Sequence, residues 1–189
     1  MTVDEFLVWA ETQPGRRFEL VYGQPVAMSP ERARHAEAKA EIYVALRDAL
    51  RRASSPCHVL PDGMTVRVDD ETAFEPDALV YCGTRIDGDQ VEIPNPIIVV
   101  EVISPSSQEY DTGAKLAGYF QVPSVRHYLI VDPLGRLIIH HARQDDATII
   151  TRIHSDGAID LTPPGLALAL GDVFPPPRLS ELSVATAPP

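Results

Sequence analysis

An aliphatic run near the middle of the chain most constrains how the chain can fold. Six of the seven residues in the range 97–103 are aliphatic, and Pro96 and Pro105 bracket the run. A near-continuous aliphatic segment of this length is typical of a central strand covered on both faces. Glu101 lies inside it, and an ionised carboxylate in such surroundings is costly unless it is paired, hydrogen-bonded or bound to a metal ion. The segment therefore predicts a central strand that contains an acid in need of a partner.

Length and charge limit the classes of protein to which the chain can belong. Its 189 residues suffice for one well-filled core, and no run of 18 apolar residues predicts a transmembrane helix, so we expect no membrane association. The formal net charge is −11, which argues against a non-specific nucleic-acid coat, because such binding depends on cationic contacts to phosphates. It does not exclude a nuclease, since an acidic metal site itself adds negative charge.

The two cysteines and the N-terminus bear on the cellular compartment. Cys57 and Cys82 have no CxxC spacing and lie in apolar segments. We expect buried free thiols in a reducing cytoplasm, with a single disulfide as the alternative. The segment 1–5 lacks the basic start and apolar core of a signal peptide, so a cytoplasmic location is expected.

The N-terminal third predicts a helix, a hairpin and a second helix. Thr2 and Glu5 have the spacing of a capping box, and Pro14-Gly15 ends the helix that follows. The segments 17–22 and 25–28 form a predicted hairpin about Gly23-Gln24. On its alternation alone, Glu19 is a solvent-facing strand residue.

A long helix is predicted from Ser29-Pro30 to about residue 53, because a capping hydroxyl followed by proline favours a helix start. Its inward stripe consists of residues spaced by three or four: His35, Lys39, Ile42, Leu46, Ala49 and Ala53. His35 then lies partly buried at the start of the stripe, where bonding to a backbone carbonyl is the simplest interpretation. Arg47, Arg51 and Arg52 suit the negative end of the helix, with phosphate contact as the alternative.

The rest of the chain predicts mainly strands, in an α/β (α+β) fold. We expect one domain over residues 1–189, with an irregular proline-rich tail from about residue 175. The remaining elements are strands at 57–60, 64–68, 75–82, 97–103 and 125–131, a helix capped by Asp111, a hairpin of 137–141 with 148–153, and one short strand after Asp156-Gly157.

Three groups can meet at one end of this sheet. Asp77 begins one strand and Glu101 lies towards the end of the next, so antiparallel pairing would place them together. Lys115 lies one turn beyond Asp111, and helical side chains lean towards the N-terminus, so it can point back at the same strand end. Two carboxylates with an ammonium suit Mg²⁺ or Mn²⁺ and phosphodiester chemistry. The structural alternative is a buried Glu101–Lys115 ion pair, with Asp77 capping a turn.

The order of several motifs resembles the Uma-two family of restriction endonucleases, within the PD-(D/E)XK nuclease superfamily. The resemblance covers roughly residues 2 to 175. It is carried by Phe18-Glu19-Leu20-Val21-Tyr22-Gly23, Met28-Ser29-Pro30, His35, Glu75-Pro76-Asp77, Val100-Glu101-Val102-Ile103-Ser104-Pro105-Ser106, the segment from Asp111 to Lys115, and the segment from Tyr119 to Asp132-Pro133.

The resemblance implies a restriction-endonuclease-like core with a divalent-metal site. In this fold a mixed central sheet is flanked by helices, with an added N-terminal helix and hairpin and a C-terminal β-hairpin. Asp77 matches the motif Asp and Glu101 the acid of the third motif, so these two would hold the metal. Position 103 is Ile where the superfamily pattern has Lys, and Lys115 maps to a family lysine on the following helix. Glu19 matches a family Glu that would serve as an extra metal or water ligand. His35 matches a family His without an assigned role.

We therefore expect a Mg²⁺- or Mn²⁺-dependent endonuclease acting on DNA, with Asp77, Glu101, Lys115 and Glu19 at its site. A homodimer would suit such an enzyme, because cutting two strands needs two sites. The alternative is a catalytically inactive nuclease-fold module for protein or nucleic-acid binding, which the acidic charge and Ile103 favour. A Ser/His hydrolase is disfavoured, because no G-x-S-x-G motif is present and the histidines at 140 and 141 lie on a peripheral hairpin.

Overall fold

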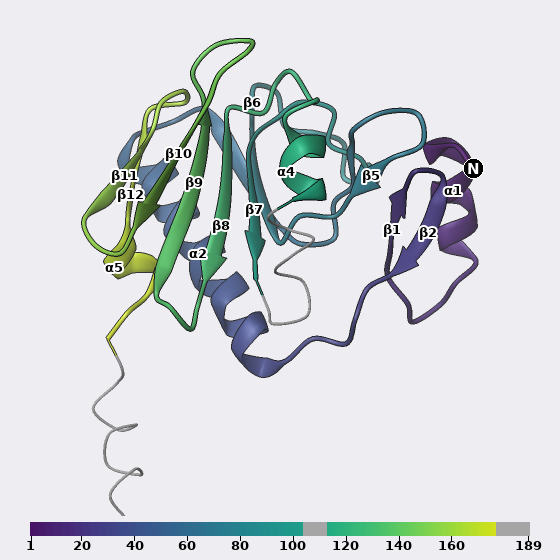
Figure 1. Ribbon diagram of the computed structural model, residues 1–189, viewed down its shortest axis with the longest axis horizontal. Helices are drawn as coiled ribbons and strands as arrows, with labels where there is room; N and C mark the ends of the chain where they lie inside the picture. The colour runs from purple at the N-terminus through teal and green to yellow at the C-terminus, as the bar shows by residue number, and fades with distance from the viewer. Residues whose placement is uncertain (104–112, 177–189) are drawn as a thin grey trace, which may run out of the picture.

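The structure is a computed structural model that describes residues 1–103 and 113–176, and its centre is a mixed six-stranded sheet (Figure 1). The strand order is β10-β9-β8-β7-β6-β3, and only β7 and β8 run parallel to each other. The predicted mixed sheet is therefore confirmed. Its strands are β3 Cys57–Pro61, β6 Ala78–Cys82, β7 Pro96–Val102, β8 His127–Asp132, β9 Leu137–Arg143 and β10 Ile149–His154.

The central strand β7 is the one that the aliphatic run predicted. Its side chains alternate between two apolar clusters on opposite faces of the sheet. Ile98, Val100 and Val102 belong to one cluster, whereas Val99 belongs to the other. Ile103, just after the strand, is 8% exposed and continues the second cluster. Both faces of β7 are thus covered, as its composition indicated.

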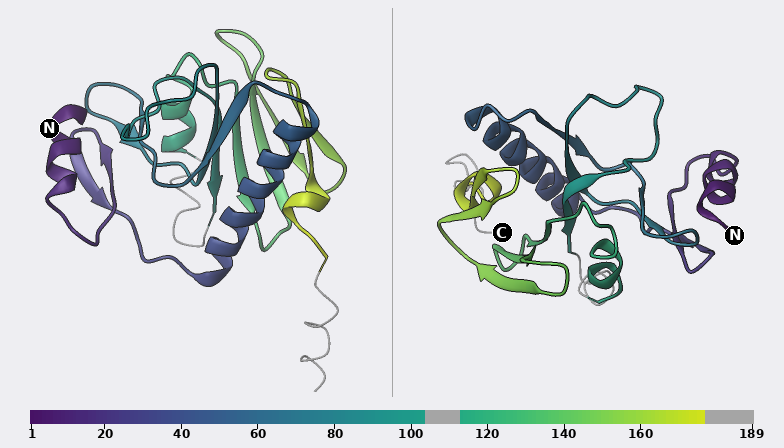
Figure 2. Two further views of the ribbon diagram at one scale, coloured as in Figure 1. Left: turned by 180° about the vertical axis from the view of Figure 1, so that it is seen from behind. Right: turned by 90° about the horizontal axis from the view of Figure 1, so that it is seen from above.

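Two helices cover these faces from opposite sides (Figures 1 and 2). Helix α2, Ala33–Arg52, packs against one face, and the shorter α4, Ala114–Tyr119, lies over the other. The predicted start of α2 at Ser29 was wrong: Arg32 is the N-cap and makes no side-chain capping bond. Met28 N still donates to Arg17 O at 2.9 Å, so the chain leaves the hairpin there and must cross to the sheet before the helix begins.

The N-terminal part forms a smaller sheet with the strand order β2-β1-β5-β4, beside helix α1 (Figure 1). The predicted capping box is confirmed, because Thr2 and Glu5 exchange side-chain and backbone bonds. The hairpin turns at Tyr22 and Gly23, which have φ angles of 48° and 75°. Two positive φ angles match the twist of the flanking strands. The bounds are α1 Val3–Glu11, β1 Phe18–Val21, β2 Gln24–Ala27, β4 Val66–Arg67 and β5 Ala73–Phe74.

The C-terminal part contains more structure than the sequence indicated. One short strand was expected, but the chain forms the hairpin of β11, Ala158–Leu161, with β12, Leu166–Ala169, and then helix α5, Leu170–Val173. Leu166, Leu168 and Leu170 lie in the same apolar cluster as Ile42 and Leu46 of α2. Their alternation was hidden by the cluster of prolines and the glycine between β11 and β12.

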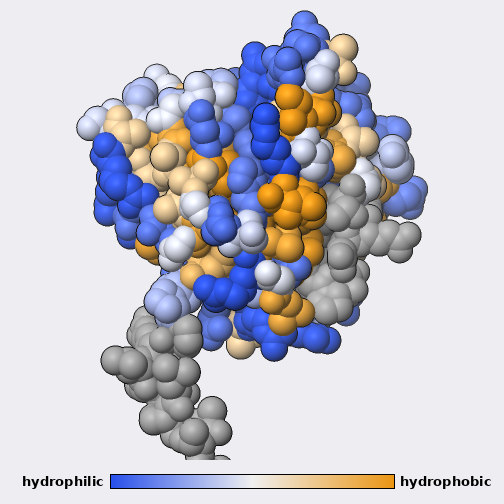
Figure 3. Space-filling view, turned by 60° about the vertical axis from the view of Figure 1, so that its left-hand side comes forward, coloured by the Kyte–Doolittle hydropathy of each residue, from blue (hydrophilic) through white to orange (hydrophobic). Residues whose placement is uncertain are grey.

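Strand β10 is one of the two edge strands of the large sheet, and β3 is the other. Ile149 and Ile153 on this strand are 42% and 69% exposed. Figure 3, which brings this side of the molecule forward, shows apolar patches separated by hydrophilic side chains. Within the described part of the chain, no helix combines the length and the hydropathy needed to span a bilayer. The predicted cap Asp111 lies outside the described residues, and α4 begins after Gly113.

Cys57 and Cys82 form a disulfide bond, so the expectation of free thiols was wrong. The two residues lie directly opposite each other on the antiparallel strands β3 and β6. Cys82 is also exposed rather than buried. Strand register, which puts the sulfur atoms within bonding reach, could not be derived from spacing alone. The free thiols were one reason to expect a reducing compartment, and that reason no longer holds.

We predict that neither cysteine reacts with iodoacetamide when the protein is unfolded without reductant. Replacing both by serine should lower the free energy of unfolding by about 2–4 kcal/mol, because the bond closes a loop with a sequence separation of 25. Intact mass after alkylation and urea titration are the measurements. Two added carbamidomethyl groups in the unreduced protein would show that the thiols are free.

Three histidines form a row across β8, β9 and β10, in which His127 and His140 are buried and His154 is half-buried. His127 Nε2 lies 2.8 Å from the carbonyl oxygen of Pro163 and therefore donates to it. His127 Nδ1 then accepts from His140 Nε2 at 2.9 Å, so the His127 ring is neutral. The His140 and His154 rings are 5.9 Å apart. Burial, and then the neighbouring His127, lower the pKa of His140 to about 3.

This row predicts a loss of stability in mild acid. A histidine whose pKa is depressed on folding takes up protons only in the unfolded chain between its unfolded pKa near 6.5 and its folded pKa near 3. At pH 5 this costs roughly 2 kcal/mol for His140 relative to pH 7.5. His140→Gln keeps a donor for His127 but cannot titrate, so its urea midpoint should fall less over this range. Equal pH dependence of both proteins would contradict the assignment.

Candidate functional site

The four residues predicted for the site come together at one end of the large sheet. Asp77 immediately precedes β6, and its N–H donates to Val100 O at 2.9 Å. Ala78 pairs with Val100 in the antiparallel register, so the start of β6 lies beside the end of β7, which contains Glu101. This is the juxtaposition that the sequence predicted.

Glu101 is held by two side chains of α4. It is 4% exposed, and its Oε1 accepts from Lys115 Nζ at 2.7 Å and from Tyr119 Oη at 2.6 Å. Burial, and then the charge of Glu101, raise the pKa of the Tyr119 hydroxyl well above its ordinary value, so Tyr119 remains a donor. The buried Glu101–Lys115 ion pair considered as a structural alternative is thus present.

Glu19 of β1 joins the same group from the smaller sheet. Its Oε1 accepts from Lys115 Nζ at 2.8 Å and from Glu75 N at 2.9 Å. Glu19 is 7% exposed, so the expectation of a solvent-facing side chain was wrong. In an isolated hairpin this face would be exposed to solvent. In the structure it is buried, because it packs against the end of the large sheet and against Lys115.

Asp77 contacts the opposite layer of the structure. Its Oδ2 accepts from Val102 N at 2.7 Å, and its Oδ1 lies 3.2 Å from Lys39 Nζ on α2. Asp77 therefore holds the end of β7 rather than capping a turn. It is 6% exposed, and Lys39 is 9% exposed. One lysine thus approaches the site from α2 and the other from α4, on opposite faces of the sheet.

His35, in the first turn of α2, contacts the end of β7. Its Nε2 lies 2.6 Å from Val102 O and its Nδ1 lies 2.7 Å from Glu31 Oε1. The expected bond to a backbone carbonyl is confirmed. The Asp77 Oδ2 atom is 3.6 Å from Nε2, so His35 also borders the candidate site.

Several charged residues of the site were not assigned from the sequence. Lys39 Nζ lies 2.6 Å from Asp62 Oδ2 and 2.8 Å from Glu31 Oε1. Burial tends to raise the pKa of both carboxyl groups, but the Lys39 hydrogen bonds, with Arg17 on Asp62 and His35 on Glu31, lower it overall. Lys39 was placed on the inward stripe of α2, and a lysine in such a stripe is itself a sign of a buried partner.

Carboxylates, the side chains that hard divalent cations prefer, predominate in the charged network of the site. Carboxylates outnumber Lys and Arg by six to three in this network, and Mg²⁺ is often held by only one or two carboxylates and water. Within residues 1–103 and 113–176, no three His, Cys, Asp or Glu side chains converge closely enough to hold a metal as they stand. Ammonium groups lie between the acids instead. The network consists of Glu19, Glu31, Asp62, Glu75, Asp77 and Glu101 with Arg17, Lys39 and Lys115.

A cavity of about 340 Å³ opens beside Asp77 on the α2 side. Lys39, Asp62 and Tyr43 are among the residues that line it. The Asp77 half of the site therefore has adjoining space, whereas Lys115 and Glu101 are each 4% exposed.

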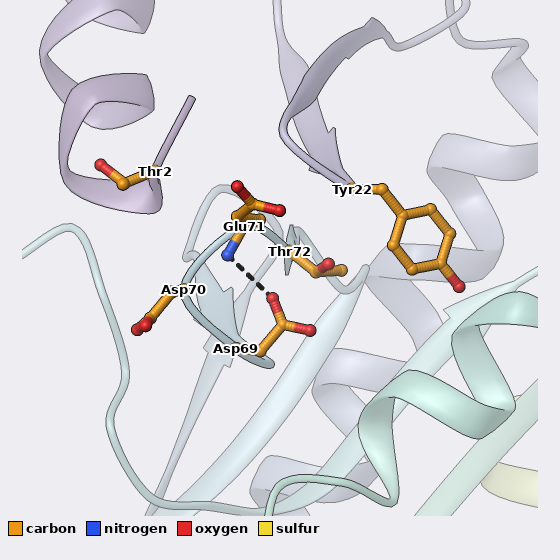
Figure 4. Close-up of a pocket in the computed structure, with 6 residues that line it drawn as sticks. All are labelled: Thr2, Tyr22, Asp69, Asp70, Glu71 and Thr72. Atoms are coloured by element: carbon orange, nitrogen blue, oxygen red, sulfur yellow. Dashed lines mark hydrogen bonds between the residues drawn. The ribbon is translucent and has the colours of Figure 1, made fainter.

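A second hollow, of about 480 Å³, lies between α1, the β1–β2 turn and the β4–β5 turn (Figure 4). Asp69, Asp70 and Glu71 line it, and Asp69 accepts from Glu71 N at 2.8 Å. Figure 4 shows the three acidic side chains pointing in different directions. They do not form a shared set of ligands, so this hollow is not a counterpart of the acidic network.

Comparisons with known proteins agree with this geometry. The family profile described as "Uma2: Putative restriction endonuclease" matches residues 3–171. The crystal structure of "a putative nuclease belonging to DUF820" from Anabaena variabilis superposes with a TM-score of 0.69. At 18% identity it covers 92% of this chain and 97% of that chain, so the two share a fold.

Two proteins of Synechocystis sp. are similar in sequence. "Uncharacterized protein slr1290" is 24% identical over 176 residues, which cover 92% of this chain and 91% of that protein. "Uncharacterized protein sll1609" is 26% identical over 93 residues, which cover 48% of this chain and 52% of that protein.

The buried network predicts that Lys115 is important for stability. Lys115→Met leaves Glu19 and Glu101 buried without the ammonium that they share, and should lower the free energy of unfolding by about 3–5 kcal/mol. Arg47→Met removes a cation from a half-exposed pair with Asp48, so it should cost less than about 1 kcal/mol. Urea unfolding at neutral pH compares them. Similar losses in both variants would show that the buried ion pair contributes little.

Proposed function

This chain belongs to the family described as "Uma2: Putative restriction endonuclease", and from that membership we propose that it is a metal-dependent endonuclease that hydrolyses DNA phosphodiester bonds. One observation supports the proposal most directly. Two buried acids, Asp77 and Glu101, lie at the adjoining ends of β6 and β7 within a network that has a surplus of negative charge. Buried acids that outnumber the nearby cations destabilise a folded core, whereas a bound divalent cation would neutralise their excess negative charge.

Asp77 and Glu101 would hold the cation, Mg²⁺ or Mn²⁺. When bound, it would polarise a phosphoryl oxygen and lower the pKa of a bound water molecule. Both acids already sit in fixed positions, since Val102 N holds Asp77 and Tyr119 Oη holds Glu101. Lys39 and Lys115 contact these acids in the structure, so a metal ion would have to exchange with contacts that the acids already make.

Lys115 would serve the nucleophile or the phosphate. Its ammonium lies 2.7 Å from Glu101 and 2.8 Å from Glu19, so these two carboxylates orient it. From this position it would orient a water molecule or stabilise the negative charge that develops on the phosphate. Glu19 would assist by holding Lys115 or by acting as an additional ligand.

DNA is the substrate that we propose, and a homodimer would provide the second site needed to cut both strands. The acidic net charge of −11 implies that contacts to phosphates come from local groups of arginines rather than from the whole surface. The proposed location is the cytoplasm, where a nuclease would meet DNA, although the Cys57–Cys82 disulfide argues against this location.

A nuclease-fold module without catalytic activity is the second candidate. The buried Lys115–Glu101 pair favours it, because the ion pair satisfies the acid without a metal ion. Ile103 also favours it, because this side chain packs in an apolar cluster where the superfamily pattern places a lysine.

Cleavage of supercoiled plasmid and of short labelled duplexes, with Mg²⁺ or Mn²⁺, tests the proposal. We expect Asp77→Asn and Glu101→Gln to lower the cleavage rate by about 100-fold or more, since each removes a metal ligand. Asp48→Asn changes an exposed acid of α2 and is the matched control, with no expected effect.

Circular dichroism of each variant would establish that the fold is retained. Cleavage that persists in Asp77→Asn would exclude the assigned site. No metal-dependent cleavage by the wild-type protein on any of these substrates would favour the binding module.

A further inference from the structure

The distribution of lysines in this chain is unusual. Of the 16 Lys and Arg residues only two are lysines, Lys39 and Lys115, and the other fourteen cations are arginines. Lysine is almost never fully buried in proteins unless it is paired. Both lysines of this chain are nevertheless buried, at 9% and 4% exposure, and both contact the proposed metal ligands. Lys115 already has a role in the proposed function, whereas Lys39 does not.

Lys39 occupies a cage of carboxylate oxygens. Its Nζ lies 2.6 Å from Asp62 Oδ2, 2.8 Å from Glu31 Oε1 and 3.2 Å from Asp77 Oδ1. These acids come from three different parts of the chain: the turn after β3, the segment before α2 and the start of β6. Three carboxylates around one ammonium offset its charge, although among the described residues they do not converge closely enough to hold a metal ion in its place.

The three acids depend on Lys39 to different degrees. Asp62 is also paired with Arg17 at 2.6 Å, and Glu31 is also paired with His35 at 2.7 Å. Asp77 is the most buried of the three and has its longer contact, 3.6 Å, with His35. A cation that binds Asp77 would therefore weaken mainly the Lys39–Asp77 contact, while the other two acids keep their cations.

We propose that Lys39 is a positioning residue which holds Asp77 in place until a divalent cation binds, and that the cation and the Lys39 ammonium compete for this carboxylate. The inference rests on the proposed metal-dependent function. The cavity of about 340 Å³ is relevant to this exchange, because Lys39 and Asp77 both line it. An ammonium that leaves Asp77 has room there, next to the cation and within reach of a phosphate oxygen.

This arrangement would supply from α2 the charge that the superfamily pattern supplies from the strand. Residue 103 is Ile and packs in the apolar cluster on the α4 side, so no cation can extend from that position. Lys39 approaches the end of β7 from the other face, where Asp77 already accepts from Val102 N. The two lysines would then divide the work, with Lys115 at Glu101 and Lys39 at Asp77.

The scarcity of lysines provides a direct measurement. In protein labelled with ¹⁵N-lysine, the ammonium region of the NMR spectrum contains two side-chain signals, and Lys39→Met identifies that of Lys39. We expect Mg²⁺ to shift or broaden the Lys39 signal along the same saturation curve that calorimetry gives for metal binding. A Lys39 signal that stays unchanged at saturating Mg²⁺ would overturn the proposal while leaving the metal site intact.

Metal affinity of the variants is the second measurement. Lys39→Met removes the competing cation, so it should bind Mn²⁺ about tenfold more tightly, or better, while its cleavage rate falls. Arg47→Met removes a cation from the same helix outside the cage and should leave the affinity unchanged. A purely structural lysine would instead give equal or weaker affinity in a folded Lys39→Met, and that result would overturn the proposal. Absence of Mg²⁺ and Mn²⁺ binding by the wild-type protein would overturn the proposed function as well.

Discussion

The architecture depends on one constraint, the placement of a carboxylate inside a strand that is buried on both faces. Glu101 cannot be left alone there, because an unpaired charge in an apolar core costs several kcal/mol. The Lys115 and Tyr119 contacts tie α4 to β7, and the second Lys115 contact ties the β1 hairpin to both. Elements that are far apart in the sequence are thus fixed by a single acid.

At this end of the sheet, each face has its own ion pair between a lysine and a buried acid. On the α4 side, a lysine and a tyrosine hold Glu101, whereas on the α2 side a lysine within a cage of acids holds Asp77. Both ion pairs stabilise the fold only while the acids stay ionised. A metal ion at this position would replace contacts that the protein already makes, so binding would involve exchange of cations rather than filling of a preformed hole.

Much of this could be predicted from local patterns. The capping box at Thr2, the central strand around Glu101 and the placement of Asp77 beside the end of that strand all follow from spacing and strand direction, and the structure confirms them. The direction of Lys115 followed from the lean of helical side chains. Each of these inferences needs only one element or one pair of neighbouring elements.

The inferences that failed required knowledge of how distant elements pack. Glu19 faces inward because its hairpin packs against the end of the large sheet, and the sequence of the hairpin alone does not predict this packing. Cys57 and Cys82 are bonded because of a register between two strands. Lys39 could be placed on an inward stripe, but its partners Asp62 and Glu31 lie in irregular segments whose positions have no periodic pattern. Tertiary context decided these cases.

Ile103 has a consequence for how relatives of this protein can be recognised. A search pattern that requires an acid, one intervening residue and a lysine along a single strand passes over this chain, because isoleucine packs where that lysine would be. Lys39 of α2 and Lys115 of α4 instead bring ammonium groups to the strand end from the two faces of the sheet. Relatives of this kind are therefore better recognised by superposing structures and asking whether a lysine nitrogen lies near the end of the strand. A sequence pattern along one strand does not detect them.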